Sequence, residues 1–360
     1  MTLRHLRESD IPAAVALFER VYPQHRWTSH ATCESYFREM LFANPWRDLD
    51  LPSWVAEEDG RIVGFVGVVP RPMRYNGRDI RVAAGCQFMV DPDRRQTLIA
   101  LQLVKAVLSG PQDLFIADGA NDEARRVWLG IGGTAPLLYS MHWTRVLRPM
   151  QYLLSLADRN GERLWARAAR PIAALADGLA PRLRQNNFNR DDDNLTEAPL
   201  RGELMTAHLT QVCSGSVLNP VYDARALDWL LDQIAQKSRY GTFHARAVFD
   251  ARRDLVGWYV HYVRRGAVSE VVQLAARKGD FEPVLQKLLS DGWRHGAVAV
   301  RGRMDPRLVQ QLSDRHCWFR REGAWMLAHS RHADLTAAFD RGEVFLSRMD
   351  GEWWLRFQGG

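Results

Sequence analysis

Cysteine is scarce in this 360-residue chain, and its four cysteines form no recognisable framework. They stand far apart, at Cys33, Cys86, Cys213 and Cys317, and the chain contains neither a CxxC nor an HExxH motif. Neither a disulfide framework nor a zinc site is therefore indicated. At least three of the cysteines are predicted to be buried free thiols, and no metal is expected.

Long apolar runs are also lacking. No stretch of about 18 residues is apolar enough to suggest a membrane span, yet 46% of the residues are hydrophobic, which is sufficient for a substantial core. The first ten residues, MTLRHLRESD, carry charges where a signal peptide would need an apolar segment. We expect a soluble, globular, cytoplasmic protein.

Positive charge is present in excess, but it is unevenly distributed. Between Arg145 and Arg190 there are nine arginines and three acidic residues. Their charges sum to +6, which equals the net charge of the whole chain. This basic segment is compatible with an anionic membrane surface, with an acidic partner such as an acyl carrier protein, or with packing between domains. Nucleic acid is the weakest candidate, because no aromatic-basic binding module accompanies the charge.

The order of the expected elements suggests a duplicated domain. In the first part, a strand and a helix precede three antiparallel strands, with hairpin turns at Asp59-Gly60 and Asn76-Gly77, and then come a helix, a strand, a helix and a final extended pair. A similar order returns from about residue 205. The expected organisation is a first domain at 1–148, a basic helical linker at 149–200, a second domain at 201–335 and a tail at 336–360.

The stretch VDPDRRQTLIA, from Val90 to Ala100, joins an expected strand to an amphipathic helix. Unpaired N–H groups and the dipole at such a helix start favour an anion. With the surrounding element order, this stretch resembles the Arg/Gln-x-x-Gly-x-Gly/Ala signature of the GNAT superfamily of acyl-CoA-dependent N-acyltransferases. The resemblance covers nearly all of residues 1–150 and more loosely 205–330. It implies a mixed α/β fold of two tandem domains, each a mostly antiparallel sheet with a V-shaped splay, flanked by helices.

The resemblance also implies a binding site for acetyl-CoA or another acyl-CoA. The loop would bind the pyrophosphate, and the end of the preceding strand would bind the pantetheine arm. The implied residues are Phe88, Val90, Arg95, Gln96, Thr97, Leu98, Ile99 and Ala100. The loop departs from the family pattern because it lacks glycines, with Leu98 at the central glycine position, where its side chain narrows the space.

A second family landmark, Asn-x-x-Ala-x-x-x-Tyr, is matched by Asn121, Ala124 and, at the tyrosine position, Trp128. These positions extend the expected co-substrate site. In many members that tyrosine protonates the leaving thiolate, which an indole N–H cannot do. The carboxylate base often found on the fourth strand is absent as well.

Three other residues are candidate catalytic groups, each with a structural alternative. Asp118 is placed to act as a base, or to form a turn before Gly119. His142 is a base candidate on a late strand, or a hydrogen-bonded structural histidine. Cys86 is a nucleophile candidate, or a buried small hydrophobe.

The second copy has no loop equivalent, and it places Asp280 and Glu282 at the expected helix start, where they would repel phosphate. This copy is predicted to bind no CoA. The expected function of the chain is acyl transfer from acyl-CoA to a small amine or hydroxyl acceptor near the two-domain junction. The alternatives are a non-catalytic binding or scaffolding protein, or a carrier-protein-dependent acyltransferase, in envelope polysaccharide or lipid biosynthesis.

Overall fold

The computed structural model of the chain describes residues 1–23, 29–95, 97–159, 169, 171–173, 177 and 194–355. The chain forms two compact units. Unit 1 comprises Met1–Ser140, Gly215–Tyr222 and Glu322–Gly360, and unit 2 comprises Met141–Ser214 and Asp223–Arg321. Within the described ranges, no helix combines the length and the apolar composition that crossing a membrane requires.

Unit 1 is built around a mixed sheet with the strand order β1-β2-β3-β6-β7-β16, beside a small sheet with the order β10-β4-β5. Its strands are β1 (Thr2–His5), β2 (Trp54–Glu58), β3 (Arg61–Pro70), β4 (Met73–Tyr75), β5 (Arg78–Ile80), β6 (Val82–Val90), β7 (Leu114–Ala120), β10 (Leu218–Pro220) and β16 (Trp325–Ser330). Its helices are α1 (Ile11–Val21), α2 (His30–Leu41), α3 (Ile99–Leu108), α4 (Asp122–Gly130), α5 (Leu137–Ser140) and α12 (Ala333–Asp340), with short 3-10 turns η1 (Glu8–Asp10), η2 (Pro92–Arg94) and η5 (Glu352–Leu355).

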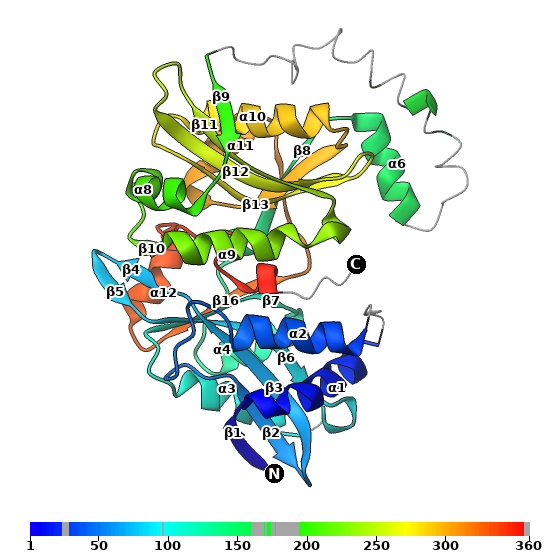
Figure 1. Ribbon diagram of the computed structural model, residues 1–360, viewed down its shortest axis with the longest axis vertical. Coiled ribbons are helices and arrows are strands. Elements are labelled where there is room, and N and C mark those ends of the chain that lie inside the picture. Colours follow the sequence, from blue (N-terminus) through cyan, green and yellow to red (C-terminus); the bar gives the residue numbers. More distant parts are fainter. Residues whose placement is uncertain are drawn as a thin grey trace. The chain divides into compact units, whose positions relative to one another are not determined.

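Alternation along the strands explains how helices cover both faces of the unit 1 sheet. Val55 of β2 and Phe65 of β3 pack against α1 and α2, whereas the adjacent Ala56 and Val66 pack in the cluster that holds α3. Successive side chains of a strand point to opposite faces, so one run of apolar residues supplies both layers. The resulting order of helix, sheet and helix can be followed in Figure 1.

The hairpin turns predicted from dipeptides are present. Asp59 and Gly60 join β2 to β3 with φ values of 51° and 75°, and Asn76 and Gly77 join β4 to β5 with φ values of 48° and 82°. Two successive positive φ values are typical of the tight turns that connect twisted antiparallel strands. The Asp-Gly and Asn-Gly pairs tolerate this backbone, which is why the sequence signals were reliable here.

Unit 2 contains a second sheet, with the strand order β15-β8-β14-β13-β12-β11-β9. Its strands are β8 (Met141–Val146), β9 (Thr196–Pro199), β11 (Thr242–Phe249), β12 (Leu255–Val263), β13 (Val268–Ala276), β14 (Ala299–Arg303) and β15 (Trp318–Arg321). Its helices are α6 (Pro149–Arg159), α8 (Gly202–Val212), α9 (Ala224–Ala235), α10 (Phe281–Arg294) and α11 (Val309–Asp314), with 3-10 turns η3 (Ser238–Tyr240) and η4 (Pro306–Leu308).

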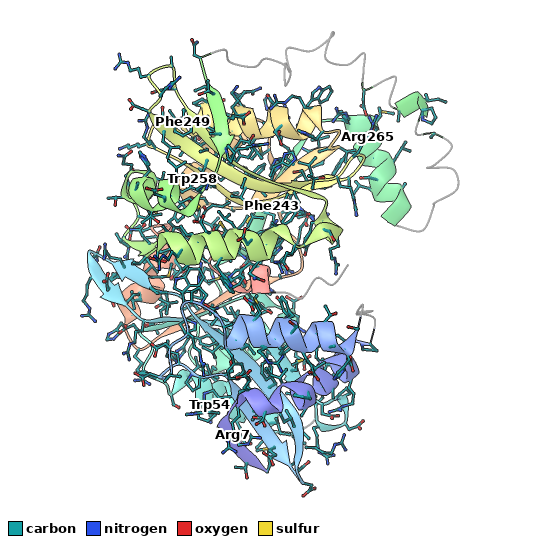
Figure 2. The ribbon with its side chains drawn as sticks, viewed as in Figure 1. Arg7, Trp54, Phe243, Phe249, Trp258 and Arg265 are labelled. Atoms are coloured by element: carbon teal, nitrogen blue, oxygen red, sulfur yellow. The ribbon has the colours of Figure 1, made fainter. Side chains whose placement is uncertain are left out.

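The strands of unit 2 are buried on both faces in its centre. Every residue of β12 is buried, including Trp258, which Figure 2 labels. The Trp258 indole Nε1 donates a hydrogen bond to Gln273 Oε1 on β13 at 2.7 Å. A large buried polar side chain is thus satisfied inside the sheet, as burial requires.

The two units repeat one supersecondary arrangement. In unit 1, β6 and β7 are parallel neighbours joined through α3, and in unit 2, β13 and β14 are parallel neighbours joined through α10. Each parallel pair is then extended by an antiparallel strand, β16 beside β7 and β8 beside β14. The duplication expected from the element order stays a prediction.

The compact units nevertheless differ from the expected sequence ranges. Residues 141–148 belong to unit 2, and residues 215–222 and 322–335 belong to unit 1. The reason is strand pairing: β8, which follows the first copy in sequence, pairs with β14, while β16 near the chain end pairs with β7. Each repeat therefore completes its sheet with the last strand of the other.

Candidate functional site

Strands β6 and β7 separate within unit 1. They pair only where Val82–Ala84 meets Leu114–Ile116, although β6 continues to Val90 and β7 to Ala120. Within β6 the backbone of Gln87 has a φ of 51°, and the pairing of β3 with β6 changes register beside it. A bulge of this kind redirects a strand and ends regular pairing. The splayed part of β6 includes Phe88 and Val90, two residues predicted for the pantetheine arm.

The loop after β6 is held by a buried aspartate. Asp91 is 5% exposed, and its carboxylate accepts hydrogen bonds from the Asp93 N–H at 3.1 Å and from Arg20 Nη2 at 3.0 Å. Further along, the Thr97 hydroxyl donates to the Arg94 carbonyl at 2.6 Å. These local bonds give the loop a defined path into α3. Arg95 is exposed in this loop, and Gln96 lies outside the described residues.

Helix α3 starts with N–H groups suited to an anion. Leu98 occupies the cap position and makes no side-chain cap bond, while the Ile99 N–H donates to the Thr97 hydroxyl oxygen at 3.5 Å. First-turn amides such as that of Ala100 have no partner inside a helix, and the dipole adds partial positive charge. The Leu98 side chain is 67% exposed. The predicted loop residues thus stand at a helix start beside the splayed edge of β6.

Gly64 allows α3 to pack closely against the sheet. A Cβ atom at Gly64 of β3 would lie 2.8 Å from both Ile99 Cγ2 and Leu103 Cδ1. Ile99 and Leu103 are 3% and 0% exposed, so the helix packs through them. Ile99 is therefore a core contact, and only its backbone N–H is available for a ligand at the helix start.

A segment near the end of the chain contacts both separated strands. The Glu352 N–H of η5 donates to Asp118 Oδ1 of β7 at 2.5 Å, and the Gln87 N–H of β6 donates to Glu352 Oε1 at 3.4 Å. The segment thereby places a carboxylate beside the bulge of β6. Reasoning from the sequence missed Glu352, because it lies 234 positions from Asp118.

The same segment is anchored by a buried arginine. Arg71 Nη2 donates to the Met349 carbonyl at 2.7 Å, and its guanidinium lies 4.1 Å from the centre of a Trp46 ring. Asp350 accepts a hydrogen bond from Tyr222 Oη at 2.7 Å, and Trp354 is fully buried. Charge-assisted bonds in a low-dielectric setting hold such a segment firmly. The sequence signal that could have revealed this was the Trp pair at 353–354, in a region that was expected to be a tail.

Two of the predicted catalytic residues lie in this region, but other groups engage them. Asp118 is 4% exposed, and its carboxylate accepts the Glu352 N–H. Cys86 is 4% exposed. Burial, and then the charge of Glu352, raises the pKa of the Cys86 thiol well above its ordinary value. A thiol held in the protonated form is a poor nucleophile, so its surroundings favour the structural alternative for Cys86.

The positions of the second family landmark have structural contacts. Asn121 Oδ1 accepts the Ala124 N–H at 2.8 Å and so caps the start of α4. Trp128 is 6% exposed, its Nε1 donates to the Ala328 carbonyl of β16 at 3.0 Å, and its ring packs against Phe115. Both residues support the fold around the site. His142 lies on β8 in unit 2, so it does not share a unit with Asp118 or Cys86.

The start of α10 in the second copy has its acidic residues paired. Asp280 accepts a hydrogen bond from Arg277 Nε at 2.8 Å, and Glu282 is paired with Arg315. The helix start is therefore occupied by ion pairs. That this copy binds no CoA stays a prediction.

The basic segment at 145–190 falls largely outside the described residues. Of its arginines, Arg148 is directed into unit 2, where its Nη2 donates to the Trp293 carbonyl at 2.7 Å and its guanidinium lies 3.9 Å from the centre of a Trp293 ring. This arginine thus stabilises unit 2. The predicted membrane or carrier-protein contact of the segment stays a prediction.

Comparison with known proteins finds a family model that matches the first part of the chain. Residues 2–112 match the family model described as an acetyltransferase (GNAT) domain. A comparison with curated protein sequences found no match.

Solved structures with similar folds extend over most of the chain. One is a probable N-acyltransferase from Enterococcus faecalis V583, with a TM-score of 0.60 and 10% identity, covering 91% of this chain and 72% of that one. Another is a GCN5-related N-acetyltransferase from Anabaena variabilis ATCC 29413, with a TM-score of 0.59 and 11% identity, covering 91% and 72%. A third, from Kribbella flavida, has a TM-score of 0.55 and 13% identity, covering 91% and 70%. At these identities the likeness concerns the fold.

Proposed function

Residues 2–112 of this chain are a GNAT acetyltransferase domain, and from this premise we propose that the protein transfers an acyl group from acyl-CoA to an amine or hydroxyl acceptor. The observation that carries the proposal is the uncapped start of α3 next to the splayed edge of β6. A helix start of this kind suits a pyrophosphate, and unpaired strand edges suit the amides of a pantetheine arm. A cytoplasmic location, expected from the sequence, fits a reaction that consumes acyl-CoA.

In the proposed reaction, Glu352 is the base. Its carboxylate lies at the β6 bulge, where the thioester end of a pantetheine arm bound along β6 would arrive. The acceptor nitrogen or oxygen forms a bond to the acyl carbon, the C–S bond breaks, and the acceptor proton passes to Glu352. CoA leaves as a thiolate, because the tyrosine position holds the buried Trp128, which donates no proton. Asp118 acts as a positioning residue, since it holds the backbone of Glu352.

The phosphate assignment is tested by calorimetric titration with acetyl-CoA and with CoA, using Thr97→Glu. Thr97 precedes α3, so the new carboxylate would compete with a pyrophosphate for the same amides. Thr32→Glu is the matched control: it places the same charge in the first turn of α2, three residues after the cap Ser29, where glutamate is well tolerated. We expect saturable binding at one site per chain, lost in Thr97→Glu and retained in Thr32→Glu. Equal binding by both variants would show that the pyrophosphate does not bind at the start of α3.

The turnover assignment is tested by following CoA release with a thiol reagent in the presence of a panel of amines. Glu352→Gln keeps the size and the hydrogen-bond acceptor of the side chain but removes its basicity, so we expect kcat to fall by about 100-fold or more. Glu343→Gln is the control, because the Glu343 side chain forms a surface ion pair with Arg341. Full activity in Glu352→Gln would exclude this residue as the base.

The runner-up is a non-catalytic member that binds acyl-CoA or serves as a scaffold. It is favoured by the structural roles of Trp128, Cys86 and Asp118, which leave few groups for acid–base chemistry. Tight CoA binding without release of thiol from any amine or hydroxyl acceptor would support it. If a carrier-bound acyl group reacted and acyl-CoA did not, the carrier-protein-dependent reaction would be supported instead.

A further inference from the structure

Two histidines and an aspartate meet in the interior of unit 2, away from any residue used above. His244 lies on β11, His261 on β12 and Asp291 near the end of α10, the helix that packs against β12 and β13 (Figure 1). His244 Nδ1 lies 2.6 Å from Asp291 Oδ2, and His261 Nε2 lies 2.8 Å from the same oxygen. One ligand atom from each residue lies within 4.8 Å of the other two.

The cluster is largely buried, but one side of it can be reached from solvent. His261 is fully buried, Asp291 is 4% exposed and His244 is 9% exposed. On the outer side lies His295, with a ring centroid 4.5 Å from that of His244 and a side chain that is 48% exposed. Arg294 approaches Asp291 Oδ1 at 3.7 Å and is also partly exposed. An ion could therefore enter past His244 and His295.

The neighbours of His261 determine which of its nitrogens carries a hydrogen. The Ser269 hydroxyl donates to the Tyr262 carbonyl at 2.8 Å, so it must accept from His261 Nδ1, which lies 2.8 Å away. In the neutral ring, the lone pair of Nε2 then points at Asp291 Oδ2, which is also an acceptor. Two acceptors this close require a cation between them, either a proton or a metal ion.

This arrangement matches the way proteins prepare histidine for a metal. A ligating histidine commonly donates its other ring N–H to an oxygen, which orients the ring and exposes the ligating lone pair. Ser269 supplies that oxygen here. Asp291 lies in the last turn of α10, where the exposed carbonyls of the helix add partial negative charge and favour a cation.

We propose that His244, His261 and Asp291 form a binding site for a divalent metal ion of the zinc type. Two imidazoles and one carboxylate are a ligand set that zinc accepts, with bonds of about 2.0 to 2.2 Å and a fourth position for water. Ligand atoms around a tetrahedral ion at these bond lengths lie about 3.3 Å apart. Small side-chain rotations would lengthen the observed contacts of 2.6 and 2.8 Å to this separation.

The ion would bind β11, β12 and α10 together. It would lie in unit 2, whereas the proposed acyl-transfer residues lie in unit 1. Its expected role is therefore to stabilise unit 2, and the inference does not depend on the proposed function.

The test uses the full chain after treatment with a chelator and removal of the chelator. Zn²⁺ is titrated by calorimetry, and Co²⁺ is added as a spectroscopic probe whose visible absorption strengthens in four-coordinate sites. We expect one Zn²⁺ per chain, a four-coordinate Co²⁺ spectrum that Zn²⁺ abolishes, and a thermal midpoint that rises with Zn²⁺ concentration, because a ligand bound only by the folded state stabilises it.

His244→Gln is the main variant, since His244 lies at the outer edge of the cluster and its replacement leaves the buried His261 in place. We expect at least a tenfold loss of Zn²⁺ affinity and loss of the Co²⁺ spectrum, with the circular dichroism spectrum unchanged. Asp291→Asn should lose binding as well. His332→Gln, at an exposed histidine of unit 1, is the control and should bind as the wild type does. The proposal is overturned if the wild type binds no Zn²⁺, or if it binds no more tightly than His244→Gln.

Discussion

Replacing Asp118 should loosen the segment near the chain end that carries Glu352. Asp118 is 4% exposed, and its carboxylate accepts the Glu352 N–H at 2.5 Å. Hydrogen bonds to charged groups contribute about 1.5 to 3 kcal/mol. Asp118→Ala removes the acceptor and leaves this N–H unpaired, so a loss of about 2 to 3 kcal/mol in the free energy of unfolding is expected. Asp118→Asn keeps an accepting oxygen and should lose only about 1 kcal/mol.

The assay is urea unfolding of the full chain, read as the shift of the midpoint at constant slope. Asp79→Ala is the control, because Asp79 forms a surface ion pair with Arg74 and should change stability by less than about 1 kcal/mol. If Asp118 only positions Glu352, Asp118→Asn should keep most of the CoA-releasing activity, whereas Asp118→Ala should lose it with its stability. An unchanged midpoint in Asp118→Ala would refute the anchoring role, and an inactive but fully stable Asp118→Asn would make Asp118 the base.

Three further predictions concern packing and protonation. Burial, and then Arg239, lowers the pKa of Lys237 from 10.5 to about 7. Between these two pKa values the unfolded chain binds more protons than the folded chain. The free energy of unfolding should therefore rise by about 4 to 5 kcal/mol as the pH increases from about 7 to 10.5. Urea unfolding of Lys237→Met should lack this rise. Gly64→Ala places a methyl 2.8 Å from the Ile99 and Leu103 side chains and should cost about 1 to 3 kcal/mol and weaken acetyl-CoA binding, as read by calorimetry. Native Cys86 should resist iodoacetamide near neutral pH and react on unfolding, because burial raises its pKa; rapid native labelling, located by mass spectrometry, would contradict this.

Much of unit 1 follows from local patterns. The strand ending at Val90, the loop after it and the amphipathic helix α3 were all predicted from residues close together in the chain. The hairpin turns at Asp59-Gly60 and Asn76-Gly77 were predicted because few dipeptides adopt two successive positive φ values. The mixed α/β class and the GNAT resemblance are confirmed by the fold and by the match at residues 2–112.

Other features depended on contacts that no local pattern encodes. Helix α2 was not predicted, since its residues 30–41 are less strongly amphipathic than those of α3. The exchange of β8 and β16 between the sheets was also not predicted, because either strand has the same alternation whichever sheet it joins. Residues 336–360 were expected to be a tail, yet they contain the end of α12 and the turn η5.

The sequence by itself determined many of the strands and helices, the resemblance to a GNAT domain and the loop before α3, because these follow from the period or spacing of neighbouring residues. Tertiary structure decided which groups meet. It brought Glu352 to Asp118, and it brought His244 and His261 to Asp291 from separate strands and a helix. Side-chain distances across strands and helices depend on register and packing, so chemistry that arises from residues tens or hundreds of positions apart appears only in the folded chain.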